Sequence, residues 1–469
     1  MSFAHDFEAT SLREYDIRGI VGKTLSAEDA FAIGRTFGSL VRRNGGKTLV
    51  VGYDGRLSSP MLEEALVKGA LECGLDVTRV GRGPTPMLYY ASATLDADGA
   101  IMVTGSHNPP NYNGFKMMLA GKPFFGAQIR ELGDLSAQGN VVAPEQGTVR
   151  TIDVRDAYVK RLVKDYDGGT RKLKIVWDNG NSSAGEVLEK MVAALPGEHI
   201  VLNAAIDGTF PAHHPDPTVA KNLEQLIAAV KDNHADLGIA FDGDADRIGL
   251  VDNTGEILWG DQILVLLARD VLKSHSGATI IADVKASQVL FDEVARAGGQ
   301  PLMWRTGHSL IKSKMAETGS PLAGEMSGHI FFADKWYGFD DALYAGVRVL
   351  GIVARSSETL SAFRESLPAT LSTPEVRFDC DDHRKFKVIE EVAERLRKAG
   401  ADVSEIDGVR VNTTDGWWLL RASNTQAVLV ARAEGRDDAG LERLKGALVE
   451  QLEKSGLSRP DFSGNNAGH

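Results

Sequence analysis

The sequence lacks the features that mark secreted, membrane-spanning and disulfide-stabilised proteins. Its 469 residues include only two cysteines, Cys73 and Cys380, which rule out a disulfide framework or a thiolate metal site. No apolar run approaches the roughly 20 residues that span a bilayer, and residues 1–6 show no basic segment followed by an apolar one. We therefore expect a cytoplasmic protein with no membrane partner.

Net positive charge is also lacking. The chain has 52 lysines and arginines against 64 acidic residues, a formal net charge of −12, so nucleic acid is not an expected partner. An acidic protein can still bind phosphorylated molecules if its cations gather locally, which gives weight to arginines and lysines in glycine-rich loops. The length exceeds what one hydrophobic core supports, and we expect about three or four domains.

Three segments share one pattern. Each is an apolar strand followed by Asp, a short polar turn and a helical stretch with a serine at its start, as in a βαβ unit. The strands cover residues 49–53, 173–177 and 279–282, and the helical stretches cover residues 61–73, 184–195 and 288–297. After a further helix and strand, each copy reaches an unusual loop, and we expect these three loops to meet at one central cleft.

The C-terminal segment differs from these three copies. From residue 374 it predicts a strand, a long helix over 383–399, closely spaced strands from 408 to 433 and a last helix over 439–454. This order is typical of an α+β domain with an antiparallel sheet. The predicted domains are 1–150, 151–256, 257–370 and 371–469, with a hinge near residues 372–374.

The first unusual loop, residues 104–109, presents Ser106 directly after a buried-type strand. Gly105 and Pro109 restrict the backbone, and Lys116 supplies a cation for a charged oxygen. The carboxyl ends of strands in α/β sheets are where such folds keep their chemistry. We interpret Ser106 as a phosphoryl carrier, although a solvated polar turn has the same composition.

The second loop places Asp242, Asp244 and Asp246 at alternate positions after an apolar strand. Three crowded carboxylates repel unless a cation joins them, and oxygen ligands favour Mg²⁺ or Ca²⁺. The spacing does not fit an EF-hand, which requires glycine where Arg247 stands and glutamate where Asn253 stands. A solvated acidic turn is the remaining alternative, and Arg247 is positioned to brace the charge.

The third loop, residues 324–329, offers a carboxylate, a hydroxyl and an imidazole at alternate positions, which predicts that all three lie on one side of an extended loop. These are Glu325, Ser327 and His329. A carboxylate beside a hydroxyl suits vicinal sugar hydroxyls, and His329 can move a proton near neutral pH. An ordinary polar strand is the alternative.

A fourth loop in the C-terminal segment has the groups of a phosphate cradle: a guanidinium, two hydroxyls and an amide. Weaker candidates lie at strand ends or in the first loop region, where capping or surface roles are equally compatible. The cradle residues are Arg421, Ser423, Asn424 and Thr425, and the weaker candidates are Tyr15, Arg18, Lys285, Gly307 and His308.

Taken in order, residues 14–19, 104–109, 242–247, 324–329 and 421–425 resemble the α-D-phosphohexomutases over almost the whole chain. The resemblance implies three related α/β domains with mixed sheets around a central cleft, plus a C-terminal α+β domain with a helix-flanked antiparallel sheet. It implies catalytic roles for Ser106, His107, Lys116, Arg18 and His329, and a Mg²⁺ site made by Ser106, Asp242, Asp244 and Asp246. It implies substrate contacts from Tyr15, Arg247, Lys285, Gly307, His308, Glu325, Ser327, His329, Arg421, Ser423, Asn424 and Thr425.

The implied reaction is reversible phosphoryl transfer between O1 and O6 of hexose phosphates, through phospho-Ser106 and a 1,6-bisphosphate. Glucose 1,6-bisphosphate or mannose 1,6-bisphosphate is then the expected activator, and hexose phosphates are the small-molecule partners of a monomer or weak homo-oligomer. Met326 in the third loop and Asn424 in the fourth loop make the chain resemble the bacterial phosphomannomutase/phosphoglucomutase group. Phosphoglucosamine mutase, a metal-dependent sugar phosphatase and a non-enzymatic sugar-phosphate binding protein stay open as alternatives.

Overall fold

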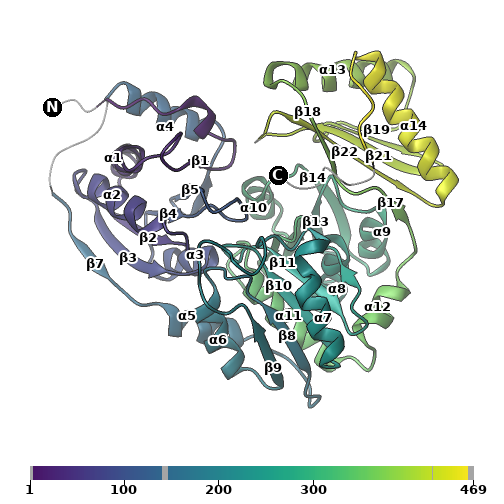
Figure 1. The fold of residues 1–469 in the computed structure, drawn as a ribbon, viewed down its shortest axis with the longest axis horizontal. Coiled ribbons are helices and arrows are strands. Elements are labelled where there is room, and N and C mark those ends of the chain that lie inside the picture. The colour runs from purple at the N-terminus through teal and green to yellow at the C-terminus, as the bar shows by residue number, and fades with distance from the viewer. Residues whose placement is uncertain (1–3, 140–145, 425, 463–469) are drawn as a thin grey trace.

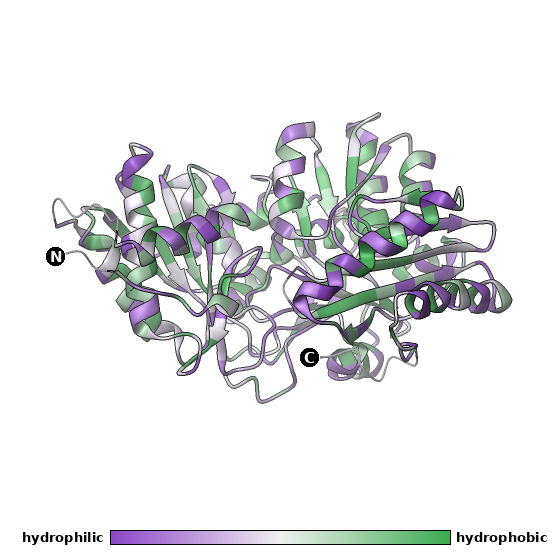
Figure 2. Cartoon of the chain, turned by 90° about the horizontal axis from the view of Figure 1, so that it is seen from above, coloured by the Kyte–Doolittle hydropathy of each residue, from purple (hydrophilic) through white to green (hydrophobic). Residues whose placement is uncertain are grey.

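The computed structural model describes residues 4–139, 146–424 and 426–462. Its sheets follow one another around the molecule in chain order, with the N-terminal domain at the left of Figure 1 and the C-terminal domain at the upper right. The strands are mostly green and the helices alternate purple and green in Figure 2, as expected for amphipathic helices packed on apolar sheets. No helix in the described part of the chain combines the length and apolarity needed to cross a membrane.

The N-terminal domain is built on a sheet of seven strands in the order β1-β5-β4-β2-β3-β7, with β6 beside β5. Its strands are β1 (Ile17–Ile20), β2 (Thr48–Tyr53), β3 (Asp76–Arg82), β4 (Gly99–Val103), β5 (Tyr112–Leu119), β6 (Lys122–Phe124) and β7 (Val149–Thr151). Its helices are η1 (Ala9–Ser11), α1 (Ala27–Arg43), α2 (Ser59–Leu71), α3 (Thr85–Thr94) and α4 (Ala127–Ala137).

The second sheet has the order β12-β11-β10-β8-β9, and the third has the order β14-β13-β15-β16. The second contains β8 (Lys174–Asp178), β9 (Glu198–Leu202), β10 (Leu237–Phe241), β11 (Ile248–Asp252) and β12 (Ile257–Leu258). The third contains β13 (Thr279–Asp283), β14 (Gln300–Trp304), β15 (Leu322–Gly324) and β16 (Ile330–Phe332). Helices of this region are α5 (Arg155–Val163), α6 (Gly185–Ala194), η2 (Ala220–Leu223), α7 (Glu224–Asp232), α8 (Gly260–Ser274), α9 (Gln288–Arg296), α10 (His308–Thr318), α11 (Ala342–Arg355) and α12 (Leu360–Ser366).

The three predicted modules share one strand arrangement. In each, the first strand pairs in parallel with the second and the third, and the third pairs antiparallel with a fourth. The four strands in chain order are β2, β3, β4 and β5, then β8, β9, β10 and β11, then β13, β14, β15 and β16. The expectation of related α/β domains with mixed sheets is confirmed.

The serine expected at the start of each helix caps only one of the three. Ser287 accepts a hydrogen bond from the backbone N of Val289, 3.1 Å away, at the start of α9. In the other two copies a serine donates its hydroxyl to the strand-end turn: Ser59 to Asp54 and Ser182 to Asn179. In these two copies the hydroxyl therefore stabilises the turn before the helix.

The C-terminal domain has an antiparallel sheet in the order β17-β22-β21-β20-β19, with β18 beside β22, as predicted. Its elements are β17 (Leu371–Ser372), β18 (Val376–Asp379), α13 (Asp382–Lys398), β19 (Val403–Ser404), β20 (Val409–Thr413), β21 (Gly416–Ala422), β22 (Val428–Gly435) and α14 (Asp438–Lys454). Both helices pack on this sheet around an apolar core of their own. The domain limits stay predictions.

The segment expected to be a hinge is part of this last sheet. β17 pairs with β22, and Thr373 donates its backbone N to the carbonyl of Ala433 at 2.9 Å. The Thr373 hydroxyl also accepts from the backbone N of Ala433 at 3.0 Å. The exposed residues 368–370, which lie between α12 and β17, are therefore a better location for a hinge.

Candidate active site

Three of the predicted loops occupy the same place in their modules. Residues 104–111 connect β4 to β5, residues 242–247 connect β10 to β11, and residues 325–329 connect β15 to β16. Each therefore follows the third strand of its module and turns the chain into the antiparallel fourth. Hydrogen bonds and ion pairs join the three loops, which therefore meet as the sequence predicted.

Ser106 has a left-handed backbone, with φ of +49°, and its side chain is buried against the second domain. Its hydroxyl donates to Asp242 Oδ2 at 3.0 Å and lies 3.2 Å from His107 Nδ1. The backbone N of Ser106 donates to Thr104 Oγ1 at 2.9 Å. A non-glycine residue in this conformation is costly and persists only where its surroundings fix it, which is frequent at functional sites.

The side chain that fixes this loop is Arg56, which the sequence analysis did not select. Its guanidinium donates to Asp54 at 3.1 Å and to four backbone carbonyls of the loop and its exit. Those carbonyls belong to Ser106, Asn108, Pro109 and Tyr112. The Asp54-Gly55-Arg56 sequence at the carboxyl end of β2 was the available signal, because a buried arginine at a strand end needs several acceptors.

Close approach of the first two loops requires glycine. A Cβ atom at Gly243 would lie 2.3 Å from the carbonyl O of Ser106, and one at Gly105 would lie 2.4 Å from the Arg56 guanidinium carbon. Any larger residue would push the serine loop away from the carboxylates. The glycines therefore set the distance between Ser106 and Asp242.

Asp242, Asp244 and Asp246 are fully buried, and one oxygen of each lies within 4.8 Å of the others. Lys116 Nζ contacts Asp244 at 2.7 Å and Asp246 at 2.5 Å. Burial and the two neighbouring carboxylates hold the pKa of Asp242 well above its usual value. Asp244 Oδ1 and Asp246 Oδ1 have no hydrogen-bond partner among the described residues.

This environment fits a hard divalent cation. Three buried carboxylates carry more negative charge than Lys116 offsets, and Asp244 Oδ1 is left for a ligand. Mg²⁺ accepts such oxygen ligands and commonly adds a phosphate oxygen. Burial alone would lower the pKa of Lys116, but Asp244 and Asp246 raise it well above its usual value, so this lysine stays cationic.

The third loop brings Glu325, Ser327 and His329 together, although by a turn and not by an extended chain. The backbone N of Gly328 donates to the carbonyl of Glu325 at 3.0 Å, and Gly328 has φ of +89°. His329 Nδ1 lies 2.9 Å from Glu325 Oε2 and 3.1 Å from Ser327 Oγ. Glu325 Oε1 also accepts from the backbone N of Gly307 at 2.6 Å.

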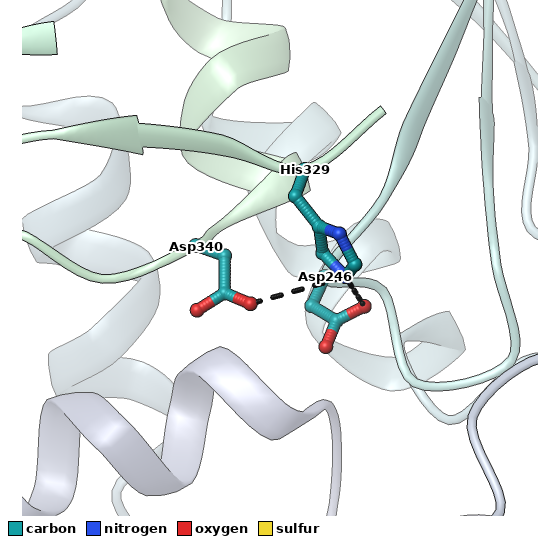
Figure 3. Close-up of side chains that lie close together, drawn as sticks. All are labelled: Asp246, His329 and Asp340. Carbon is teal, nitrogen blue, oxygen red and sulfur yellow. Dashed lines mark ion pairs between the residues drawn. The ribbon is translucent and has the colours of Figure 1, made fainter. Parts of the chain in front are cut away.

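The imidazoles of His308 and His329 lie beside the loop of residues 242–247, and their pKa values shift in opposite directions. Burial lowers the pKa of His329, but Asp246, 3.2 Å from its Nε2, outweighs burial and raises the pKa to about 9. Burial together with Lys312 and Lys116 holds the pKa of His308 well below its usual value. Figure 3 shows His329 with Asp246 and with Asp340, a buried carboxylate that the sequence analysis did not select. Groups whose pKa values are pushed apart in this way are candidate acid and base partners.

Arg247 and His329 connect the second loop to the third. They form an isolated β-bridge, and Arg247 Nε lies 3.4 Å from His329 Nε2. The backbone N of Arg247 also donates to Asp242 Oδ1 at 3.1 Å. The expected bracing of the carboxylate cluster therefore includes the backbone of Arg247 as well as its charge.

The C-terminal loop contacts Tyr15 of the N-terminal domain. Arg421 Nε donates to Asp407 at 3.0 Å, and Asn424 Nδ2 donates to the Tyr15 hydroxyl at 2.8 Å. Ser423 Oγ accepts from the backbone N of Gln426 at 3.2 Å. Thr425 lies outside the described residues. Burial raises the pKa of Tyr15 to about 12, so its hydroxyl keeps its proton.

The remaining cationic candidates are held by carboxylates. Arg18 donates to Asp16 at 2.5 and 3.1 Å, and Lys285 Nζ lies 2.9 Å from Glu375 Oε2. A phosphate that binds to either cation must therefore compete with an acidic partner. The predicted residues thus lie in four loops and on the strands and turns next to them.

Four family profiles match the chain in order. They describe the phosphoglucomutase/phosphomannomutase alpha/beta/alpha domain I over residues 9–140, domain II over 156–255, domain III over 259–371 and the C-terminal domain over 375–451.

Curated relatives include a phosphomannomutase/phosphoglucomutase of Pseudomonas putida, 47% identical over 94% of this chain and 95% of the relative. Another from Pseudomonas aeruginosa is 44% identical over 96% and 97%. A solved structure of a phosphoglucomutase/phosphomannomutase family protein from Burkholderia thailandensis is 45% identical, covers 96% of this chain and 98% of its own, and has a TM-score of 0.90.

Three repeated α/β modules with equivalent loops, followed by a smaller antiparallel domain, define the α-D-phosphohexomutase class. Within it, the chain belongs to the phosphoglucomutase/phosphomannomutase family.

Proposed function

We propose that this protein is a phosphomannomutase/phosphoglucomutase that moves a phosphoryl group reversibly between O1 and O6 of glucose and mannose phosphates. The observation that carries the proposal is the placement of the Ser106 hydroxyl 3.0 Å from Asp242, inside a buried cluster of carboxylates and Lys116. Curated relatives at 44–47% identity have this name, which supports the proposal over phosphoglucosamine mutase and phosphatase activity.

In the proposed reaction, phospho-Ser106 gives its phosphoryl group to the free hydroxyl of a hexose 1- or 6-phosphate. The bond from Ser106 Oγ to phosphorus breaks, and the sugar oxygen forms a bond to phosphorus. The sugar hydroxyl proton passes to one imidazole of the His308 and His329 pair, and one proton is returned to Ser106 Oγ, so that the transfer consumes no net proton. Lys116 and Arg18 offset the negative charge of the transferring group. The product is a 1,6-bisphosphate and a free serine.

Ser106, Asp242, Asp244 and Asp246 would hold Mg²⁺ in this scheme, since their buried oxygens lie close together and Asp244 Oδ1 has no hydrogen-bond partner among the described residues. When bound, the cation would supply positive charge beside the phosphoryl oxygens. Glucose 1,6-bisphosphate or mannose 1,6-bisphosphate would phosphorylate a free serine and so activate the enzyme.

The bisphosphate must turn end for end before the second transfer. Glu325 and Ser327 would hold the sugar hydroxyls in both orientations, and Arg421, Ser423, Asn424 and Thr425 would hold whichever phosphate is distant from Ser106. Tyr15, Lys285, Gly307 and Arg247 complete the proposed contacts. We also propose that the protein is cytoplasmic and that it is a monomer or a weak homo-oligomer.

The test is conversion of glucose 1-phosphate to glucose 6-phosphate with Mg²⁺ and glucose 1,6-bisphosphate, followed by the same assay with mannose 1-phosphate. Ser106→Ala should remove turnover and the mass increase of one phosphoryl group on the protein. Ser136→Ala, a buried serine in α4 that bonds the carbonyl of His5, is the matched control. Phosphate release without isomerisation, or activity confined to glucosamine 1-phosphate, would refute the proposal.

A further inference from the structure

The aspartate that ends the first strand of each module holds a site loop directly in two of the three copies. Asp54 accepts from the backbone N of Gly105 at 3.0 Å, and Asp283 accepts from the backbone N of Met326 at 3.0 Å. The equivalent residue of the second module is Asp178, at the end of β8. Its partners differ, and they lead to a different part of the chain.

Asp178 binds His213 in place of its module's own site loop. Its Oδ2 lies 2.9 Å from His213 Nε2, while its Oδ1 accepts from the backbone N of Gly180 and from Asn203 Nδ2, both at 2.9 Å. In the described part of the chain it accepts no hydrogen bond from residues 242–247. The Asp178 carboxylate is fully buried, and a buried carboxylate needs such donors or a cation.

His213 supplies that cation. Its Nδ1 lies 3.0 Å from the carbonyl O of His214, so both ring nitrogens face acceptors. A neutral imidazole has only one N–H, and an imidazolium has two. Burial lowers the pKa of His213, but the hydrogen bond to Asp178 raises it above its usual value. The resulting ion pair ties residues 205–217, in the connection from β9 to η2, to the end of β8.

This segment contacts the serine loop and the arginine that fixes it. Phe210 has φ of +51°, which is costly unless the surroundings fix it, and its ring centroid lies 5.2 Å from the guanidinium carbon of Arg56. Burial lowers the pKa of His214, and a hydrogen bond to the backbone of His107 partly offsets that effect. His107 directly follows the proposed nucleophile in the chain.

The same segment contacts the loop of residues 242–247. Pro215 Cγ lies 3.5 Å from the position that a Cβ atom would take at Gly243. Burial lowers the pKa of Arg247, and Asp216 is the carboxylate that most strongly raises it, to above its usual value. One segment thus contacts both loops between which phosphoryl transfer is proposed.

We propose that His213, paired with Asp178, is a positioning residue for phosphoryl transfer, because it holds residues 205–217 against the first two site loops. The inference rests on the proposed function, since the spacing of these loops affects turnover only if the phosphoryl group is transferred there. His213 resembles Arg56 of the first module, a cation that binds the strand-end aspartate and fixes a site loop. Loss of the pair should therefore lower kcat more than it changes KM.

The experiment compares His213→Gln, which keeps an amide donor for Asp178 but has no positive charge, with Asp178→Asn and with the double variant. Each single variant should lower kcat about tenfold, because small displacements of reacting groups are costly. KM for glucose 1-phosphate should stay within about twofold of the wild-type value. The double variant should lose no more than the less active single variant, since the two residues act as a unit. His199→Gln, at a half-buried histidine of β9 that accepts from Trp177, is the matched control and should keep wild-type kcat.

Hydrogen exchange measures the position of the loops without relying on activity. In both single variants the backbone amides of residues 205–217 and of residues 105–109 should exchange faster than in wild type, whereas those of α14 should not change. Unchanged exchange at residues 105–109 would overturn the proposal, because it would limit the role of His213 to its own segment. Wild-type kcat in both variants would also overturn it.

The two proposals fail in different ways. A wild-type protein without mutase activity would refute the proposed function, and exchange at residues 105–109 would still support or overturn the positioning role of His213. Circular dichroism checks that each variant is folded, and either single variant carries the test if the other is not.

Discussion

Arg56 offers a test of how the serine loop is positioned, because its guanidinium bonds Asp54 and four backbone carbonyls while buried. A lysine keeps the charge but cannot span those acceptors. We expect Arg56→Lys to lower the free energy of unfolding by about 3 kcal/mol and kcat by at least tenfold. Substrate KM should change little, since Arg56 acts through the loop.

Urea unfolding and the coupled mutase assay measure these effects. Arg130→Lys is the control, because Arg130 is exposed and pairs with Glu14 at 3.3 Å in the same domain. A variant with wild-type kcat would show that the loop keeps its position without the guanidinium.

Asp341 gives a pH prediction that does not involve the three aspartates of the proposed Mg²⁺ site. Burial raises its pKa to about 7, with Tyr158 donating to Oδ2 at 2.7 Å and the backbone N of Tyr344 donating to Oδ1 at 2.9 Å. Because the folded state binds this proton more tightly than the unfolded state, the contribution to stability is present below about pH 4. It is lost as pH rises to about 7, by up to about 4 kcal/mol.

Asp341→Asn removes this titration while keeping an acceptor for the Tyr344 backbone. The stability of the variant relative to wild type should therefore improve steadily from pH 4 to pH 7 and then level off. Urea unfolding at several pH values measures the difference. Parallel stability curves would mean that Asp341 is ionised in the folded protein.

Individual residues of the candidate site were predictable where the sequence placed them in a recognisable loop. Ser106, Asp242 and Glu325 each follow an apolar strand in a polar, glycine-containing turn. Arg56 and Asp340 were missed because their roles depend on partners distant in sequence, the Ser106 loop and His308. Long-range contacts of this kind leave no local pattern.

At the level of strands and loops, repetition carried more information than any single motif. Three copies of a strand, an Asp-containing turn and a helix predicted that three loops would be equivalent, and β4, β10 and β15 place them so. The shape of the third loop was less predictable. Alternating polar residues suggested an extended chain, but Gly328 with φ of +89° permits a turn that brings Glu325 and His329 together.

The loop between β10 and β11 should respond to Mg²⁺ as a unit. Ligand binding to the folded state alone adds about 2.7 kcal/mol of stability at 100 times Kd, so we expect Mg²⁺ to raise the Tm and chelation to reverse the rise. Asp244→Asn should abolish this response. Its Oδ2 contacts with Thr85 and Lys116 have an acceptor in asparagine, while Oδ1, which has no hydrogen-bond partner in the described chain, becomes an amide.

Thermal unfolding with Mg²⁺ and with chelator gives this comparison directly. Asp156→Asn is a suitable control, because its side chain is exposed and pairs only with Lys190 among the ion pairs of the described residues. An unchanged Mg²⁺ response in Asp244→Asn would place the cation elsewhere.

At the scale of the whole molecule, the number and order of domains followed from the sequence, whereas the contacts of the last domain with the third did not. The last domain is attached to the third by buried arginines: Arg410 donates to the carbonyls of Val284 and Ala286, and Arg432 donates to that of Lys285. These hydrogen bonds join two surfaces that lie far apart in the sequence, and no repeat or periodic pattern of the sequence indicates that they meet.

Tyr15 links the N-terminal domain to the third and the C-terminal domains, and it supports a test of domain closure. Its hydroxyl donates to the carbonyl of Thr306 at 2.7 Å and accepts from Asn424 at 2.8 Å, while its ring lies against Gly307. Tyr15→Phe keeps the ring and removes both hydrogen bonds, which are worth about 1 kcal/mol each. The ratio of closed to open molecules should then fall by a factor of about 30.

Small-angle scattering without substrate should show a larger radius of gyration for Tyr15→Phe than for wild type, and glucose 1-phosphate should reduce the difference. Substrate KM should rise because part of the binding energy is then used for closure. Tyr337→Phe, at an exposed tyrosine, controls for loss of a hydroxyl. Identical scattering and KM for wild type and Tyr15→Phe would mean that the Arg410 and Arg432 contacts alone hold the last domain over the cleft.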